Sequence, residues 1–254
     1  MSGPNSTAQR PRWLPWTVLV TAGLTPKFGP FRLYAQLARR LATEGFLTLR
    51  FDLGGIGDSG TGRAELPLAR RTELEIRAAV EHVLERGAFA GVTLGGLCSG
   101  AEDSLRYAEL DPRITGLVLM DPFGYKTLGW KARDLPIRLL RLTLWKMGLL
   151  PTYGGASNGD FLIDYKHMEH PESSRILRTM VERGVPMHFV YTGGMHESFN
   201  HKRQFKAMFP GIDFKGKVTL DYYPRLRHTQ PLEADRRLVI GSITGALLAR
   251  APAA

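Results

Sequence analysis

The only cysteine of the chain lies in a segment whose spacing suits a nucleophile. Residues 96–100 read Gly-Leu-Cys-Ser-Gly, a Gly-x-nucleophile-x-Gly pattern with Cys98 in the place usually taken by serine. Small flanking residues allow a tight turn that exposes the central side chain on a strained backbone. A strand-like run at 92–94 precedes the turn, and the helical run 101–110 that follows points a thiolate-stabilising N-terminus at it. A lone cysteine is often only a core residue, but this setting predicts a catalytic thiol.

A cysteine nucleophile needs a base, and His228 has the right place in the chain. It lies between the last predicted strand (217–223) and the last predicted helix (232–249), where the base follows in the order nucleophile, acid, base. The alternative interpretation is a surface histidine in a basic loop. The remaining histidines lack this placement and show no metal-ligand spacing: His82, His167, His170, His188, His196 and His201. We therefore expect no metal site and no cofactor.

Two carboxylates could orient the base. Glu197 follows the predicted strand 185–191 and is at the expected topological position, so it is the favoured acid. Asp121 directly follows the preceding predicted strand (114–120) and is the alternative. A site without an acid is a third interpretation, because a thiol needs less help from its base than a hydroxyl does.

Two backbone amides are candidates for an oxyanion hole. The amide of Ser99 directly follows the nucleophile. The amide of Leu24 lies in the loop after the first predicted strand, where Gly23 would allow the backbone to approach a substrate closely.

Strand-like and helical runs alternate along the chain and must position these groups. Six strands are predicted, at 17–21, 46–51, 92–94, 114–120, 185–191 and 217–223. The clearest helices are at 31–43, 72–86, 101–110 and 232–249. This order predicts an α/β fold with a doubly wound, mostly parallel sheet. We expect one domain over residues 13–254, preceded by a disordered lead-in at residues 1–12.

The rhythm breaks between about residues 122 and 183, which we interpret as a helical lid inserted over the carboxyl edge of the sheet. Its apolar side would cover an acyl-sized pocket. Basic residues punctuate the apolar ones here: Lys126, Lys131, Arg133, Arg138, Arg141 and Lys146. Three interpretations stay open, namely a plain solvated lid, a docking face for an acidic acyl-carrier protein, and association with an anionic membrane surface. No recognised nucleic-acid module is present, so a nucleic-acid partner is not expected.

Composition excludes several classes. One cysteine in 254 residues rules out internal disulfides and multi-cysteine metal sites, and a thiol is most simply kept in a reducing compartment. No apolar run reaches the roughly 18 residues of a membrane span, so cytoplasmic residence is expected. The 34 Lys and Arg against 24 Asp and Glu leave a net charge of +10, which favours anionic partners without identifying one.

From about residue 16 to the C-terminus these motifs resemble the α/β-hydrolase superfamily. Residues 50–59, Arg-Phe-Asp-Leu-Gly-Gly-Ile-Gly-Asp-Ser, resemble a segment of its serine-aminopeptidase-like branch. The segment is structural in that branch, which implies that Asp52 and Asp58 are scaffold. Short motifs at 191–194, 200–205 and 228–229 resemble exosortase-associated hydrolases.

The main departure from that superfamily is cysteine where most members have serine. Cysteine elbows are known there among dienelactone hydrolases and polyhydroxyalkanoate synthases. A thiolate that attacks an ester or thioester forms an acyl-thioenzyme, which amines, thiols and alcohols intercept readily. The sequence therefore predicts acyl transfer or thioester hydrolysis through an acyl-Cys98 intermediate. The alternative is a catalytically silent ligand-binding or scaffold protein of the same fold.

Overall fold

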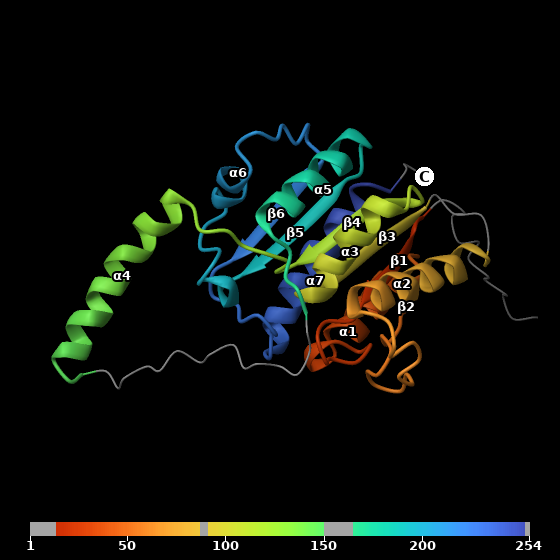
Figure 1. The fold of residues 1–254 in the computed structure, drawn as a ribbon, viewed down its shortest axis with the longest axis horizontal. Coiled ribbons are helices and arrows are strands. Elements are labelled where there is room, and N and C mark those ends of the chain that lie inside the picture. The colour runs from red at the N-terminus through yellow and green to blue at the C-terminus, as the bar shows by residue number, and fades with distance from the viewer. Residues whose placement is uncertain (1–13, 87–90, 150–164, 252–254) are drawn as a thin grey trace, which may run out of the picture.

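Six parallel strands form the central sheet of the computed structural model, which describes residues 14–86, 91–149 and 165–251 (Figure 1). In chain order they are β1 (Trp16–Val20), β2 (Thr48–Arg50), β3 (Val92–Leu97), β4 (Ile114–Met120), β5 (Met187–Thr192) and β6 (Val218–Tyr223). Their spatial order is β2-β1-β3-β4-β5-β6, and every neighbouring pair is parallel. The predicted doubly wound sheet of six strands is confirmed.

Helices cover both faces of the sheet (Figure 1). One face packs against α1 (Leu33–Thr43) and α7 (Glu233–Leu248), and the other against α2 (Leu68–Leu84), α3 (Ser99–Leu110) and α5 (His170–Glu182). Short elements complete the described chain: η1 (Pro30–Arg32), η2 (Gly193–Met195) and α6 (Gln204–Met208).

Alternation along the buried strands supplies the two cores. In β4, Leu117 and Leu119 belong to the core beneath α2, α3 and α5, whereas Val118 and Met120 belong to the core beneath α1 and α7. All four side chains are at most 1% exposed. A strand buried on both faces reads as a continuous apolar run, which is why β4 was recognisable from sequence with the same bounds.

The predicted insertion at 122–183 divides into two different parts. α4 (Leu128–Lys146) is an arm that extends away from the body (Figure 1). By contrast, α5 packs on α3 with buried Ile176 and Leu177, so the end of the predicted insertion is an ordinary helix of the sheet's cover. The predicted lead-in at residues 1–12 lies outside the described residues.

The expected packing of the α4 apolar side over a pocket is wrong for the arm as it stands. Of its large apolar side chains only Trp130 is buried, whereas Leu128 is 83% exposed and Leu139 is 55% exposed. Within the described ranges, every helix falls short of the apolar length that a bilayer-spanning segment needs.

Candidate active site

Cys98 occupies the turn between β3 and α3 in a backbone conformation that L-residues rarely adopt. Its φ is 53° and its ψ is −123°, and such strain persists only where the surroundings impose it. Here the Cys98 amide donates to the Met120 carbonyl of β4 at 2.9 Å. The Cys98 carbonyl in turn accepts from Ala101 and Glu102 in the first turn of α3. The side chain stays partly exposed, as a nucleophile must.

The glycines on either side of Cys98 are required by close backbone approaches. A Cβ on Gly96 would collide with the backbone of Gly100. A Cβ on Gly100 would lie 2.5 Å from the carbonyl oxygen of Val20, at the end of β1. The turn can therefore be this tight only with glycine at both positions, which is the reason for the motif's spacing.

A buried tyrosine that sequence reasoning missed stabilises this turn through two hydrogen bonds. The Tyr34 hydroxyl, on α1, accepts from the Leu97 amide at 2.7 Å and donates to the Val20 carbonyl at 3.0 Å. The side chain is 1% exposed, and burial raises the pKa of Tyr34 above its ordinary range. Neutral Tyr34 thus ties the residue before the nucleophile to β1.

The structure brings His228 together with Asp121. His228 Nδ1 lies 2.8 Å from Asp121 Oδ2, and Cys98 is a further interaction partner of the imidazole. Three residues that follow β3, β4 and β6 thus meet at the carboxyl edge of the sheet, the edge where open α/β sheets bind ligands.

The carboxylate of Asp121 is completely buried and its polar contacts are specific. Oδ1 accepts from the Thr192 amide at 2.7 Å, and Oδ2 accepts from the Thr192 hydroxyl at 2.6 Å. The Asp121 amide donates to the Val190 carbonyl at 2.8 Å. Thr192, which sequence reasoning missed, therefore holds the carboxylate in the orientation that faces His228. A threonine at the end of β5 carries no distinctive sequence signal.

The structure does not place the favoured acid, Glu197, beside His228. It is exposed and makes no described contact with His228. Buried Thr192 ends β5, and the 3-10 turn η2 and buried Phe199 follow it. Glu197 lies between these two buried residues and is left on the exposed side of the loop. The alternative carboxylate, Asp121, takes the position beside the base.

His228 is held in the protonated form more firmly than a free imidazole. Burial opposes its charge, but the hydrogen bonds to Asp121 and Cys98, together with the charge of Asp121, outweigh burial and raise the pKa of His228 to about 10. The loop around it is fixed by close packing, since a Cβ on Gly194 would collide with the His228 backbone. The site therefore favours an imidazolium beside the thiol, which is the form that can return a proton to a leaving group.

The two predicted oxyanion donors come from segments that touch. Gly23, with φ of 51°, donates its amide to the Ser99 hydroxyl at 2.8 Å. The next amide is that of Leu24, in a turn closed by the Thr25 amide and the Ala22 carbonyl. Neither the Leu24 nor the Ser99 amide donates to an acceptor among the described residues. Both are thus available to a substrate oxygen.

The loop that carries Leu24 is braced by the predicted scaffold residue Asp52. The Asp52 carboxylate accepts from the Lys27 backbone amide and lies 3.0 Å from Lys27 Nζ, which also reaches Asp58 at 2.8 Å. Burial opposes the Asp52 charge, but the hydrogen bonds from Lys27 keep the pKa of Asp52 below its ordinary value. Neither aspartate contacts His228 or Cys98, as expected for scaffold residues.

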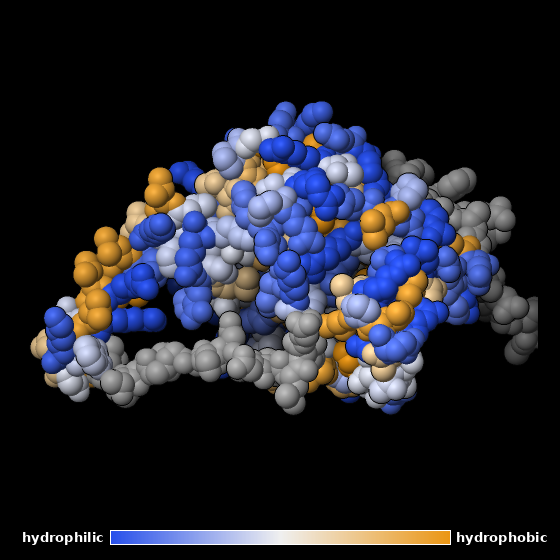
Figure 2. Space-filling view, viewed as in Figure 1, coloured by the Kyte–Doolittle hydropathy of each residue, from blue (hydrophilic) through white to orange (hydrophobic). Residues whose placement is uncertain are grey.

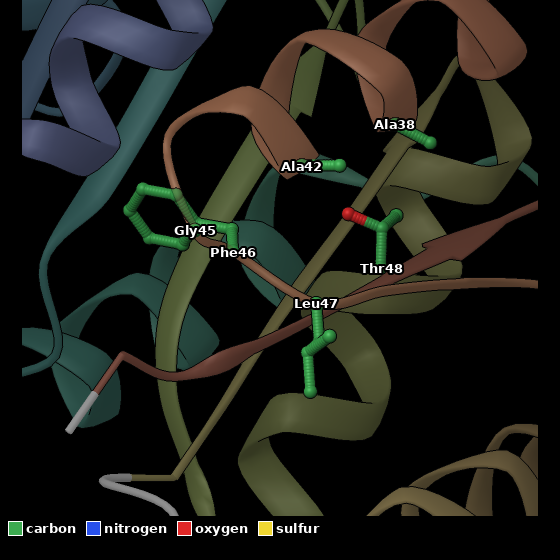
Figure 3. A pocket seen from close by; sticks show the side chains of 6 residues that line it. All are labelled: Ala38, Ala42, Gly45, Phe46, Leu47 and Thr48. Atoms are coloured by element: carbon green, nitrogen blue, oxygen red, sulfur yellow. The ribbon is translucent and has the colours of Figure 1, made fainter. Parts of the chain in front are cut away.

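Other features of the described residues do not offer a competing site. The described ranges contain no cluster of three or more His, Cys, Asp or Glu arranged to hold a metal ion. Figure 3 shows a surface hollow between α1 and the start of β2. Because the strands are parallel and Cys98 follows the end of β3, this hollow lies at the opposite end of the strands from Cys98. It is lined by Ala38, Ala42, Gly45, Phe46, Leu47 and Thr48, and none of these side chains can titrate.

Residues 17–170 match the family described as serine aminopeptidase S33, and this range is more than half of the chain. The chain belongs to the serine aminopeptidase S33 family. The matched range includes Cys98 and Asp121 and ends before His228. This S33 family member carries cysteine in the elbow, where serine is usual. No curated protein sequence matches the chain significantly. The resemblance to exosortase-associated hydrolases stays a prediction.

Solved structures share the fold of this S33 family member over nearly their whole length. Est1E from Butyrivibrio proteoclasticus, with bound ferulic acid, has a TM-score of 0.62 at 15% identity and covers 96% of this chain and 92% of its own. A soluble variant of monoglyceride lipase from Saccharomyces cerevisiae has 0.56 at 14%, covering 95% and 88%. Mouse alpha/beta hydrolase domain-containing protein 10 has 0.55 at 16%, covering 92% and 90%. At such identities the likeness shows the α/β-hydrolase fold.

Proposed function

We propose that this α/β-hydrolase is a cysteine-dependent acyl-transfer enzyme that acts on an ester or thioester through an acyl-Cys98 intermediate. Cys98 is the nucleophile, His228 the proton shuttle and Asp121 the acid that orients it. The observation that carries the proposal is the contact set around His228. One imidazole hydrogen-bonds to a buried carboxylate at 2.8 Å and interacts with a thiol held in a strained turn.

The proposed first step joins Cys98 Sγ to the substrate carbonyl carbon. The thiol proton passes to His228 Nε2, because Nδ1 faces Asp121. The carbonyl oxygen takes up the electron pair and is stabilised by the amides of Leu24 and Ser99. Collapse of this tetrahedral species expels the alkoxide or thiolate, which receives the proton from His228. The acyl group is then on Cys98.

The second step returns the acyl group to an acceptor. His228 removes a proton from water, an alcohol, a thiol or an amine as it attacks the thioester carbon. Cys98 leaves as the thiolate, and the imidazolium and thiolate pair is restored. A thioester intermediate favours transfer to such acceptors over attack on unactivated amides, so we place ordinary peptide hydrolysis outside this proposal.

Intact-mass spectrometry after exposure to p-nitrophenyl butyrate and to butyryl-coenzyme A tests the intermediate. We expect a single butyryl adduct on the wild type, assigned to Cys98 by peptide mapping. The Cys98→Ala variant should show no adduct and at least about a thousandfold loss of turnover. A wild type without an adduct across several acyl chain lengths, or an active Cys98→Ala variant, contradicts the proposal.

The Asp121→Asn and Glu197→Gln variants form a matched pair for the acid. Each replaces a carboxylate by its amide, one beside His228 and one exposed. We expect slow acylation of Cys98 in the first variant and wild-type acylation in the second. The reverse result restores Glu197 as the acid.

A further inference from the structure

α4 leaves the body close to the candidate site and exposes large apolar side chains over most of its length. Asp121 and the first residue of α4, Leu128, are seven positions apart. Side chains that are between 48% and 83% exposed are Leu128, Leu135, Ile137, Leu139, Leu140, Leu142 and Trp145. Figure 2 shows apolar side chains gathered along the edge of this arm that faces away from the body. A surface of this extent needs an explanation.

Specific contacts anchor the base of the arm. Trp130, only 5% exposed, donates its indole N–H to the His196 carbonyl at 3.0 Å. Arg133 Nε donates to Asn200 Oδ1 at 2.9 Å. The first two turns of α4 are therefore attached to the body, and the exposed apolar surface beyond them belongs to a well-attached helix.

One face of α4 is an apolar stripe. Leu128, Leu135, Leu139 and Leu142 recur at intervals of three, four and seven residues, with Ala132 between the first two. At 1.5 Å per residue the 19-residue helix is about 28 Å long. A stripe of this length suits a broad apolar layer.

Charge selects among the partners that could meet this stripe. Within α4, Asp134 is the only acidic residue, and Arg138 already pairs with it at 3.3 Å. Lys131, Arg141 and Lys146 are exposed and make no described side-chain contact. A second copy of the chain would bring like charges together, whereas an anionic surface would pair with them. An acidic carrier protein matches the charges but offers no apolar layer for the leucines.

We propose that α4 is an interfacial helix that binds an anionic lipid surface. Its leucines enter the boundary between headgroups and acyl chains, and its free lysines and arginine reach lipid phosphates through their flexible stems. Because α4 begins seven residues after Asp121, a bound arm holds the candidate site next to the bilayer. This surface is independent of the catalytic proposal.

Vesicle flotation with the full chain tests the surface. The probes are pure phosphatidylcholine vesicles and phosphatidylcholine vesicles with about 30% phosphatidylglycerol. We expect binding to the anionic vesicles only, and its loss in about 0.5 M salt, which screens the phosphates. Equal binding to both kinds of vesicle, or to neither, overturns the proposal.

A matched pair of triple variants assigns the charge effect to α4. Lys131, Arg141 and Lys146 are changed to Gln together, and we expect about a 100-fold loss of binding at about fivefold per charge. The control removes three exposed charges from the body, with Arg39, Arg63 and Arg178 changed to Gln. It should lose less than about threefold, because these charges lie on α1, on α5 and in the loop before α2 and not on the arm. Equal losses in both triples overturn the proposal.

The apolar stripe has its own test. Changing Leu135 and Leu139 to Ser should reduce vesicle binding at least tenfold. Hydrolysis of a water-soluble p-nitrophenyl ester should not change, because both side chains are exposed. Undiminished vesicle binding in this variant overturns the proposal. Two other outcomes also overturn it if the wild type does not bind vesicles. One is lipid-free self-association that depends on Leu135 and Leu139, and the other is retention on an immobilised acyl-carrier protein that depends on the same two residues.

Discussion

Side chains at the carboxyl end of the sheet are buried and hydrogen-bonded, whereas most of those on the α4 arm are exposed. At the sheet, Asp121 is fully buried, and both of its carboxylate oxygens accept hydrogen bonds. On the arm, Leu139 and Leu142 are more than half exposed and Arg141 has no described partner. The polar groups of the first region are satisfied within the described chain, whereas the apolar side chains of the second are left exposed by it. The proposed chemistry and the proposed recognition surface thus lie in neighbouring parts of one chain.

The largest expected effect is on the buried side. Asp121→Asn should lower kcat/KM by about a thousandfold, because an amide no longer stabilises the imidazolium or fixes its Nδ1 proton. Steady-state kinetics on an activated ester measure this change. Glu197→Gln serves as the control and should change kcat/KM by less than about twofold. Equal losses would remove the distinction between the buried acid and the exposed one.

Truncating a leucine should affect the free energy of unfolding very differently in the body and in the arm. Leu105 in α3 is completely buried and Leu139 in α4 is exposed. Leu105→Ala should lower the free energy of unfolding by about 3 kcal/mol, and Leu139→Ala by less than about 0.5 kcal/mol. Urea unfolding measures both values. A large loss from Leu139→Ala would mean that the arm packs against the body in solution.

The pH dependence of stability should reveal the raised pKa of His228 in the folded protein. Its pKa is raised from the ordinary 6.5 to about 10 by Asp121 and Cys98, despite burial. A group whose pKa rises on folding stabilises the protein below its unfolded pKa and loses that effect as the pH passes its folded pKa.

The stability difference between wild type and His228→Gln should therefore be on the order of 2 kcal/mol at pH 6 and shrink toward pH 10. Urea unfolding at several pH values gives this difference. On α4, Thr143→Ala removes no titratable group and should show a constant difference. A His228 difference that grows with pH contradicts the charged pair.

The smallest expected effect concerns the positioning residue Thr192. Thr192→Val removes the hydroxyl that donates to Asp121 at 2.6 Å and should lower kcat/KM about tenfold. The Thr192→Ser variant keeps the hydroxyl and should restore most of this activity. A merely structural role would leave the pH profile of kcat/KM unchanged, whereas a positioning role should alter its basic limb. Kinetics from pH 6 to 10 distinguish the two roles.

Local patterns predicted most of the fold because they record burial directly. β4 has the predicted bounds, since its apolar run is buried on both faces. The helices α1 and α7 begin and end close to their predicted positions. α5 was assigned to the insertion instead, because its stretch follows a long segment without a strand and its apolar face became evident only against α3.

The sequence by itself predicted the fold and singled out Cys98 and His228 as site candidates, because each depends on neighbouring residues: glycines around Cys98, alternation in the strands, and the loop position of His228. Tertiary structure placed Asp121 and not Glu197 beside His228, since only the packing of β4 beside β5 places Thr192 against Asp121 and leaves Glu197 in solvent. It also decided that the α4 leucines face outward. Composition showed that this segment is apolar and basic. Which side of a helix is buried depends, however, on which other elements of the chain pack against it.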